Sequence, residues 1–241
     1  MEIVKKIAAK AADLHGAKIP TIAFLGDSVT QGCFECFQKN DGGIETVFDK
    51  EHAYHTYVNQ IFSILFPRVP LNIINAGISG DNANGGLERL QRDVLCYHPD
   101  LTVVCFGLND SCKEFEGVEA YKQRLQEIFT KLQENGSEVI FMTGNMMNTD
   151  VSCHLQGDYF RDFATRFMER QNAGVLTAYF EGGKEVAAKC GVKVCDVYSK
   201  WLKLYECGVD VTELLANKLN HPIREMNWMF AYELVNTMIN D

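Results

Sequence analysis

Two residues, one near each end of the chain, carry the side chains needed to attack a carbonyl carbon. Ser28 follows the apolar run TIAFLG and an aspartate, and His221 lies in the segment NHP. A serine at a strand-to-helix junction exposes its hydroxyl at the partly positive helix N-terminus, which favours developing negative charge. A serine becomes a good nucleophile only when a base takes its proton, and the unperturbed pKa of histidine lies near neutral pH. The sequence therefore predicts Ser28 as nucleophile and His221 as general base.

Two further positions could supply hydrogen-bond donors to the same carbonyl oxygen. Gly80, within NAGISGDN, lets the backbone approach a reacting group closely, and Asn109, within GLND, carries a side-chain amide. Together with the Ser28 N–H, these groups would form an oxyanion hole with three donors. Each such donor typically contributes about 2.7 to 4 kcal/mol of transition-state stabilisation.

Five short runs rich in Val, Ile and Phe must position these residues. The runs are TIAFLG at residue 21, LNIINAG at 71, DLTVVCFG at 100, EVIFMTGN at 138 and VKVCDVYS at 192. They do not alternate with polar residues, which is typical of strands buried on both faces of a parallel sheet. Apolar residues at three- and four-residue spacing predict helices over 117–134 and 223–239. We expect an α/β fold, a three-layer α/β/α sandwich around a five-stranded parallel sheet with right-handed crossovers.

In such sheets ligands bind at the carboxyl ends of the strands, where Ser28, Gly80 and Asn109 all lie. The two least regular segments are 33–53 and 145–157. We expect the first to be a long loop without regular structure, a type of segment that is usually functional or flexible.

The four polar blocks, taken in order, resemble those of the SGNH, or GDSL, esterase/lipase superfamily. GDSVTQG is similar to the first block of that superfamily, NAGISGDN to the second, GLND to the third and NHP to the last. The specific matches are confined to these short blocks, within an architecture that extends from about residue 20 to 240.

The resemblance implies a flavodoxin-like fold in one domain over residues 1–241. It also implies that Ser28 is the nucleophile and His221 the base, and that the Ser28 N–H, the Gly80 N–H and Asn109 Nδ2 bind the oxyanion. Neither a metal nor an organic cofactor is implied. The expected activity is hydrolysis of a small-molecule carboxylic ester through an acyl-enzyme.

One position departs from the superfamily pattern. The usual aspartate three residues before the histidine is replaced by Lys218. A lysine cannot accept the imidazole N–H bond that orients the base. Either a backbone carbonyl takes this place, as in some relatives, or a carboxylate such as Asp210 or Glu213 reaches in from elsewhere.

Three alternatives to a short-chain, carbohydrate-type O-acetyl esterase stay open. A lysophospholipase or thioesterase would use Phe34, Phe37, Met146 and Met147 to line an acyl channel. A binding scaffold with weakened catalysis is suggested by Lys218. A flavin- or nucleotide-binding module would use the same kind of sheet, although the chain has neither G-x-G-x-x-G nor G-x-x-x-x-G-K-[ST].

Composition limits the partners and the compartment. The chain has 241 residues, a formal net charge of -9 and no Lys/Arg run, which argues against nucleic acids and anionic membranes. No apolar run approaches 18 residues, so no membrane span is expected. The N-terminal segment MEIVKKIAAKAADLHG predicts an amphipathic helix rather than a signal peptide. Nine cysteines at scattered spacing suit a reducing, cytoplasmic location.

Two small clusters of metal-binding residue types are weaker signals. Cys33 and Cys36 form C-F-E-C, and His52 and His55 are three residues apart. Neither is joined in the sequence by the further pair of ligands that a four-ligand zinc site needs. We expect reduced thiols in a pocket loop and no metal.

Overall fold

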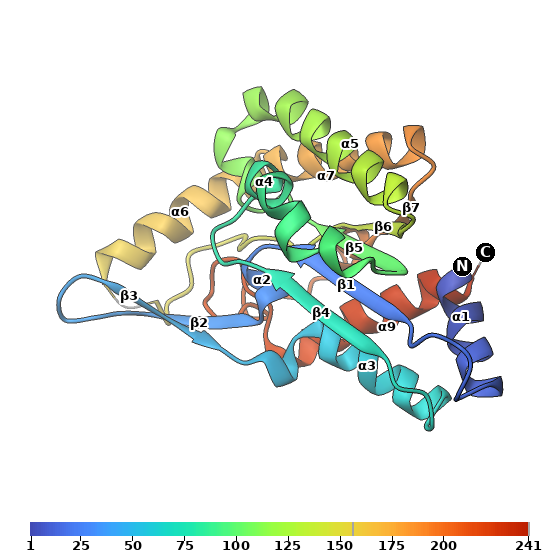
Figure 1. Cartoon of the computed structure of the whole chain (residues 1–241). Coiled ribbons are helices and arrows are strands. Elements are labelled where there is room, and N and C mark those ends of the chain that lie inside the picture. The colour runs from blue at the N-terminus through green and yellow to red at the C-terminus, as the bar shows by residue number, and fades with distance from the viewer. Residues whose placement is uncertain (156, 241) are drawn as a thin grey trace.

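Five parallel strands form the central sheet of the protein (Figure 1). The computed structural model describes residues 1–155 and 157–240. The strands lie in the order β4-β1-β5-β6-β7. Their bounds are β1 Thr21–Gly26, β4 Asn72–Gly77, β5 Leu101–Cys105, β6 Glu138–Met142 and β7 Lys193–Cys195. Each predicted apolar run contains one of these strands, which confirms the expected sheet.

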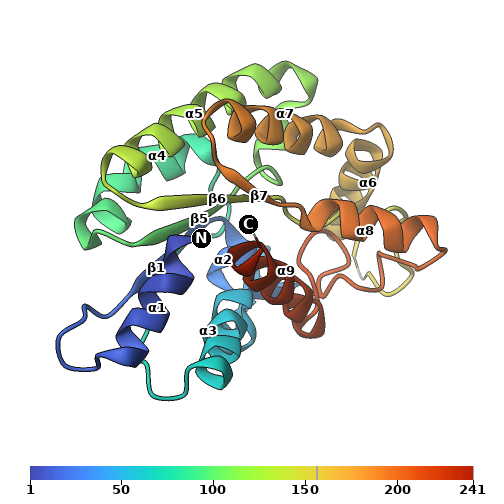
Figure 2. The same cartoon turned by 90° about the vertical axis from the view of Figure 1, so that its right-hand side faces the viewer.

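Helices cover both faces of the sheet, with α4, α5 and α7 on one face and α1, α3 and α9 on the other (Figure 2). This arrangement is the predicted α/β/α sandwich. The helices are α1 Glu2–Ala12, α2 Ser28–Gln31, α3 Tyr54–Leu65, α4 Ala83–Asp93, α5 Val118–Glu134, α6 Asp158–Asn172, α7 Val175–Lys189, α8 Val197–Glu206 and α9 Asn227–Ile239. Within the described residues, no helix combines the length and the apolar character that a membrane crossing requires.

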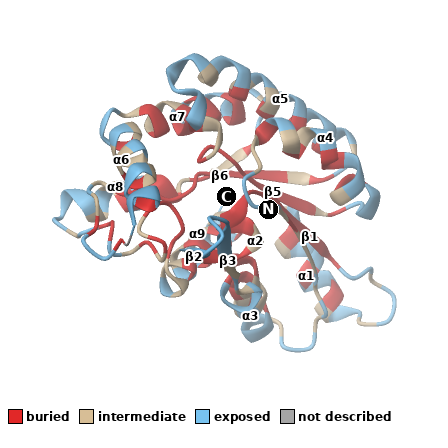
Figure 3. Ribbon diagram, turned by 90° about the vertical axis from the view of Figure 1, so that its left-hand side faces the viewer, coloured by how far each residue is buried: buried red, intermediate tan, exposed pale blue. Residues whose placement is uncertain are grey.

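Burial follows from this layering (Figure 3). Every residue of β1 and β5 is buried, as expected for central parallel strands, whereas β4 lies at the edge and only its Ala76 is buried. α5 packs through the predicted apolar stripe, whose buried members are Tyr121, Leu125, Ile128, Phe129 and Leu132. The strand ends are therefore held between two packed helical layers.

Two element boundaries differ from the prediction. The run at 192–199 is divided, because the Asp196 side chain accepts the Ser199 N–H and starts α8 directly after β7. The predicted helix over 223–239 begins only at Asn227. Ile223 has extended backbone, and its N–H donates to the Leu214 carbonyl, so the chain is not helical there.

The prediction of a long irregular loop over 33–53 was wrong. The chain forms an antiparallel hairpin of β2 (Cys33–Gln38) and β3 (Ile44–Phe48), followed by a short 3-10 turn (Lys50–His52). The hairpin is a separate two-stranded sheet that extends away from the main one (Figure 1). The described residues of 145–157 contain no helix or strand, as expected.

Candidate active site

The local fold places Ser28 where the sequence predicts it, at the carboxyl end of β1. Asp27 Oδ1 accepts the Val29 N–H at 3.0 Å and caps α2, whose first residue is Ser28. Gly77 on β4 has no room for a side chain, because a Cβ there would overlap the backbone of Thr30 and Gln31. This close contact holds α2 against β4, with Ser28 buried at 4% exposure.

His221 contacts Ser28 although 193 residues separate them in the chain. The Ser28 hydroxyl donates to His221 Nε2 at 3.0 Å, and His221 Nδ1 lies 2.9 Å from the Phe34 carbonyl oxygen. A carbonyl oxygen can only accept, so Nδ1 carries the hydrogen and the Nε2 lone pair is available to accept the Ser28 O–H. This tautomer is the one that a general base for Ser28 requires.

The group that orients the imidazole is therefore the Phe34 carbonyl, one of the two possibilities that Lys218 left open. Lys218 Nζ instead donates to Glu213 Oε2 at 2.8 Å and to the Glu213 carbonyl. Asp210 Oδ1 accepts the N–H groups of Thr212 and Glu213. The two carboxylates suggested from the sequence thus form their hydrogen bonds within the loop of residues 210–218.

Buried amides hold the loop that carries His221. Asn217 Oδ1 accepts three backbone N–H groups at 3.0 Å each, from Leu219, Asn220 and His221. Asn145 Nδ2 donates to the Asn220 carbonyl at 2.8 Å. The sequence analysis did not find these asparagines, and only the position of Asn217 shortly before the NHP segment gave a signal.

The predicted oxyanion donors come from three segments that the structure brings together. Asn109 Nδ2 donates one hydrogen to the Asp81 carbonyl at 2.7 Å and retains a second one. Gly80 has a φ of +79°, and a Cβ there would meet nothing within 4 Å, so its surroundings are open. The Ser28 N–H stands in the first turn of α2, where such groups have no intrahelical acceptor. The Ile78 N–H donates to the Gly26 carbonyl and so ties the Gly80 loop to the end of β1.

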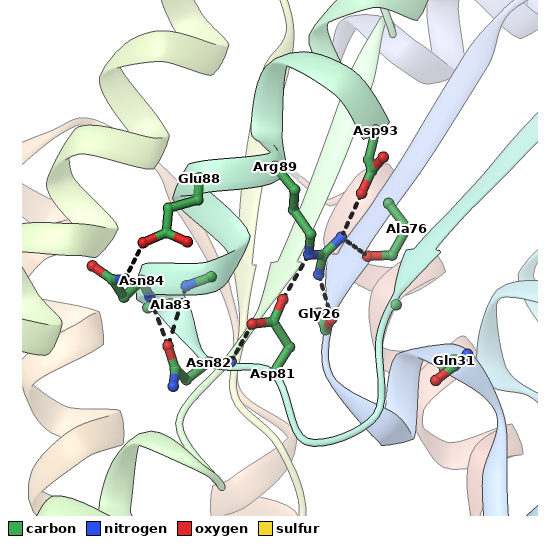
Figure 4. Close-up of polar contacts among 12 residues, drawn as sticks. Gly26, Gln31, Ala76, Asp81, Asn82, Ala83, Asn84, Glu88, Arg89 and Asp93 are labelled. Carbon is green, nitrogen blue, oxygen red and sulfur yellow. Dashed lines mark hydrogen bonds and ion pairs between the residues drawn. The ribbon is translucent and has the colours of Figure 1, made fainter.

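A buried arginine joins these segments (Figure 4). Arg89 Nε donates to Asp81 Oδ2 at 2.6 Å, Nη1 to the Ala76 carbonyl at 2.7 Å and Nη2 to the Gly26 carbonyl at 2.9 Å. One guanidinium therefore connects the ends of β1 and β4 with the residue that follows Gly80. Nothing in the sequence around Arg89 distinguishes it from a surface arginine.

Burial sets the protonation of the ionisable groups around Ser28. Desolvation lowers the pKa of His221 to about 4, against a smaller opposing effect of the Phe34 hydrogen bond. Desolvation raises the pKa of Asp27 to about 7, and the nearby charges of Asp110 and Asp81 add to this. It also raises the pKa of Asp110 to about 6. At neutral pH the imidazole is accordingly in its basic form.

Of the other residues singled out from the sequence, Phe34 lies beside His221, whereas the rest lie elsewhere. Phe34, Met146 and Met147 are buried, the two methionines in the main core, whereas Phe37 is 55% exposed on the hairpin. His52 Nδ1 bonds Asp49 Oδ2 on the surface, but His55 is buried in α3. The nine cysteines are free thiols. Over the described ranges, no three His, Cys, Asp or Glu side chains are grouped as metal ligands.

Comparison with known proteins shows the family of this chain. Residues 24–223 match the model of the GDSL-like lipase/acylhydrolase family. The chain belongs to this family. It is 25% identical over 95 residues to the acetylxylan esterase of Geobacillus stearothermophilus and 24% identical over 111 residues to the arylesterase of Vibrio mimicus. These matches cover 39% and 46% of this chain, but only 42% and 54% of the two relatives' own lengths.

Solved structures of family members share the fold over nearly the whole chain. The lipase/acylhydrolase from Enterococcus faecalis superposes with a TM-score of 0.64 at 20% identity, covering 91% of this chain and 95% of that one. A variant of the Geobacillus stearothermophilus acetylxylan esterase gives 0.66 at 16% identity, with 92% and 95% covered. The SGNH-type sandwich expected from the four blocks is therefore confirmed.

Removing the Arg89 guanidinium should be strongly destabilising. Arg89→Met leaves the Asp81 carboxylate and the Ala76 carbonyl without the guanidinium, and breaking such a buried pair costs about 3–5 kcal/mol. Arg92, on the same helix, is the matched control because its side chain is 72% exposed. Urea unfolding should show a clear loss of stability for Arg89→Met and essentially none for Arg92→Met. Equal stability of the two variants would contradict the role given to Arg89.

Proposed function

We propose that this protein is a serine esterase that hydrolyses carboxylic esters through an acyl-enzyme on Ser28. The observation that carries the proposal is the 3.0 Å contact between Ser28 Oγ and His221 Nε2. Membership of the GDSL-like lipase/acylhydrolase family and the esterase names of two relatives support it. The site needs no metal or organic cofactor for this reaction.

In the first half-reaction, Ser28 Oγ attacks the ester carbonyl carbon while its proton passes to His221 Nε2. The carbonyl oxygen becomes an oxyanion that accepts hydrogen bonds from the Ser28 N–H, the Gly80 N–H and Asn109 Nδ2. His221 then gives the proton to the leaving alkoxide, and the alcohol departs. In the second half, His221 takes a proton from water, whose oxygen attacks the acyl carbon. His221 then returns this proton to Ser28 Oγ as the bond between the acyl carbon and the serine breaks and the acid leaves.

The nucleophile can be tested directly. Ser28→Ala should lower kcat for p-nitrophenyl acetate by roughly 10⁶-fold, since no other group can form the acyl-enzyme. It should also abolish labelling by a fluorophosphonate, which peptide mapping should place on Ser28 in the unsubstituted protein. Ser63→Ala, an exposed serine on α3, is the control and should keep full activity and labelling. Absence of Ser28 labelling in the unsubstituted protein would favour the binding scaffold suggested by Lys218.

The acid limb of the pH profile should lie unusually low. The neutral imidazole is the active form, so kcat/KM rises with pH through the His221 pKa and is constant above it. Because burial lowers this pKa from 6.5 to about 4, activity at about pH 5.5 should be close to maximal. An unperturbed imidazole would leave about a tenth of it. The profile should be repeated with Asp27→Asn, which removes a carboxyl with a pKa of about 7. The variant separates the titration of His221 from that of Asp27. A midpoint near 6.5 in both proteins would exclude this protonation scheme.

For the substrate we propose a short-chain ester, most simply an O-acetyl group on a carbohydrate-type alcohol. Phe34, Met146 and Met147, which an acyl channel would need, are 1%, 2% and 0% exposed, so they are part of the packed interior. On the Gly80 side there is a surface cavity of about 520 Å³, and its walls include the charged side chains of Glu88 and Arg92. Such walls suit a hydroxyl-rich alcohol better than an acyl chain.

A chain-length series decides between this substrate class and the lysophospholipase or thioesterase alternative. Measured as kcat/KM on p-nitrophenyl esters, the rate should be highest for acetate and fall as the acyl chain lengthens. Acetylated xylo-oligosaccharides should release acetate, whereas palmitoyl-lysophosphatidylcholine and palmitoyl-coenzyme A should not be hydrolysed. A maximum at octanoyl or longer would reverse the assignment.

A further inference from the structure

We propose that Arg224, bound to Glu35 and Asp49, is a positioning residue that holds the Phe34 carbonyl against His221 and thereby replaces the acid missing at Lys218. We call Glu35, Asp49 and Arg224 the clamp. The inference rests on the proposed function of His221 as a base, and it extends the site to three charged residues that do not contact Ser28.

The clamp is a set of short, directed contacts. Arg224 Nη1 and Nη2 donate to the two carboxylate oxygens of Glu35 at 2.6 and 3.1 Å, and Nε donates to Asp49 Oδ2 at 2.8 Å. The guanidinium carbon lies 4.3 Å from the centroid of the Phe34 ring. A planar guanidinium that bonds two carboxylates and covers an aromatic ring uses the features that distinguish arginine from lysine.

These contacts close a small ring around the imidazole. His221 bonds the Phe34 carbonyl, Phe34 is joined to Glu35 by a peptide bond, Glu35 pairs with Arg224, and Arg224 follows His221 by three residues. The segment of Phe34 and Glu35 is therefore joined to the segment of His221 and Arg224 at two points. These are the His221–Phe34 hydrogen bond and the Arg224–Glu35 ion pair. A shift of β2 relative to His221 would break both.

The hairpin needs such an anchor because it is not part of the main sheet. β2 and β3 bond only to each other among the described strands, and an isolated two-stranded hairpin is at best marginally stable in water. Its base is closed by the bond from the Asp49 N–H to the Gly32 carbonyl at 2.8 Å. Arg224 bonds residues of both arms of the hairpin, Glu35 within β2 and Asp49 directly after β3.

The clamp also has the charge that the missing acid would bring. Two carboxylates face one guanidinium within it, and the Glu35 carboxylate favours the protonated imidazole. A carbonyl oxygen alone orients His221 but has no net charge to stabilise the imidazolium formed during attack. Phe34 and the clamp together supply the two effects that one aspartate usually provides.

The test compares Arg224→Gln and Glu35→Gln with Lys184→Gln. Lys184 is the matched control, because it also bridges two carboxylates, Glu181 and Asp196, at similar exposure, but joins α7 to the start of α8. Both clamp variants should lose about 10- to 100-fold in kcat on p-nitrophenyl acetate with little change in KM, since a misplaced base costs this much. The Lys184→Gln variant should retain the unsubstituted rate. The double variant Arg224→Gln/Glu35→Gln should fall no further than the worse single variant, because both changes remove one interaction.

A second readout does not depend on catalysis. The hydrogen-bonded Nδ1–H of His221 should give a far-downfield proton resonance at low pH that weakens or moves upfield in Arg224→Gln and stays in Lys184→Gln. If Arg224→Gln does not fold, Arg224→Lys keeps the charge but not the paired bonds, and should show intermediate kcat and a shifted resonance. Unsubstituted kcat and an unchanged resonance in a folded clamp variant would overturn the proposal. If the unsubstituted protein hydrolyses no ester, the proposed function fails, yet the resonance still reports whether the clamp holds His221.

Discussion

The site depends on the buried guanidinium of Arg89. Carbonyl groups at the carboxyl ends of parallel strands lose their sheet partners where the chain turns away, and a buried carbonyl without a donor is costly. Arg89, at 7% exposure, supplies donors to the Gly26 carbonyl at the end of β1, to the Ala76 carbonyl one residue before the end of β4 and to the Asp81 carboxylate. Desolvation of the guanidinium is offset because Arg89 pairs with the carboxylates of Asp81 and Asp93 and also bonds two backbone carbonyls. The bonds of Arg89 therefore position the turns that carry Ser28 and Gly80.

The base is controlled by different physics. A backbone carbonyl selects the tautomer of His221 as well as a carboxylate does, but it is a dipole and not a charge. With the imidazole buried and no carboxylate in contact, desolvation dominates and the pKa falls to about 4. Such a base is unprotonated at neutral pH but has less driving force to accept a proton. The negative charge of Glu35, near Phe34, opposes this effect because it favours the protonated imidazole. The bonds of Asn217 fix the loop that carries His221.

The sequence predicted what residue type alone determines. The central strands could be found because strands buried on both faces must be apolar throughout, and Ser28 and His221 could be singled out as candidates because few other side chains can do the proposed chemistry. The β2–β3 hairpin was missed because most of it is not buried: only Cys33 and Phe34, at the start of β2, are buried, whereas Phe37, Ile44 and Phe48 are exposed. The acceptor for His221 could not be identified either, since every residue has the same carbonyl. Arg89 and Asn217 act through backbone partners that only folding brings near.

The order of these parts along the chain has a consequence for synthesis. The oxyanion segments, Arg89 and Asp81 all lie within the first 110 residues, so a ribosome-bound nascent chain already contains the nucleophile side of the site. His221 and Arg224 emerge more than a hundred residues later. At typical elongation rates of about 5–20 residues per second, the 193 residues between Ser28 and His221 take roughly 10–40 seconds to synthesise. Until His221 is synthesised, the Ser28 hydroxyl has no imidazole to take its proton, so under the proposed mechanism the growing chain cannot hydrolyse esters.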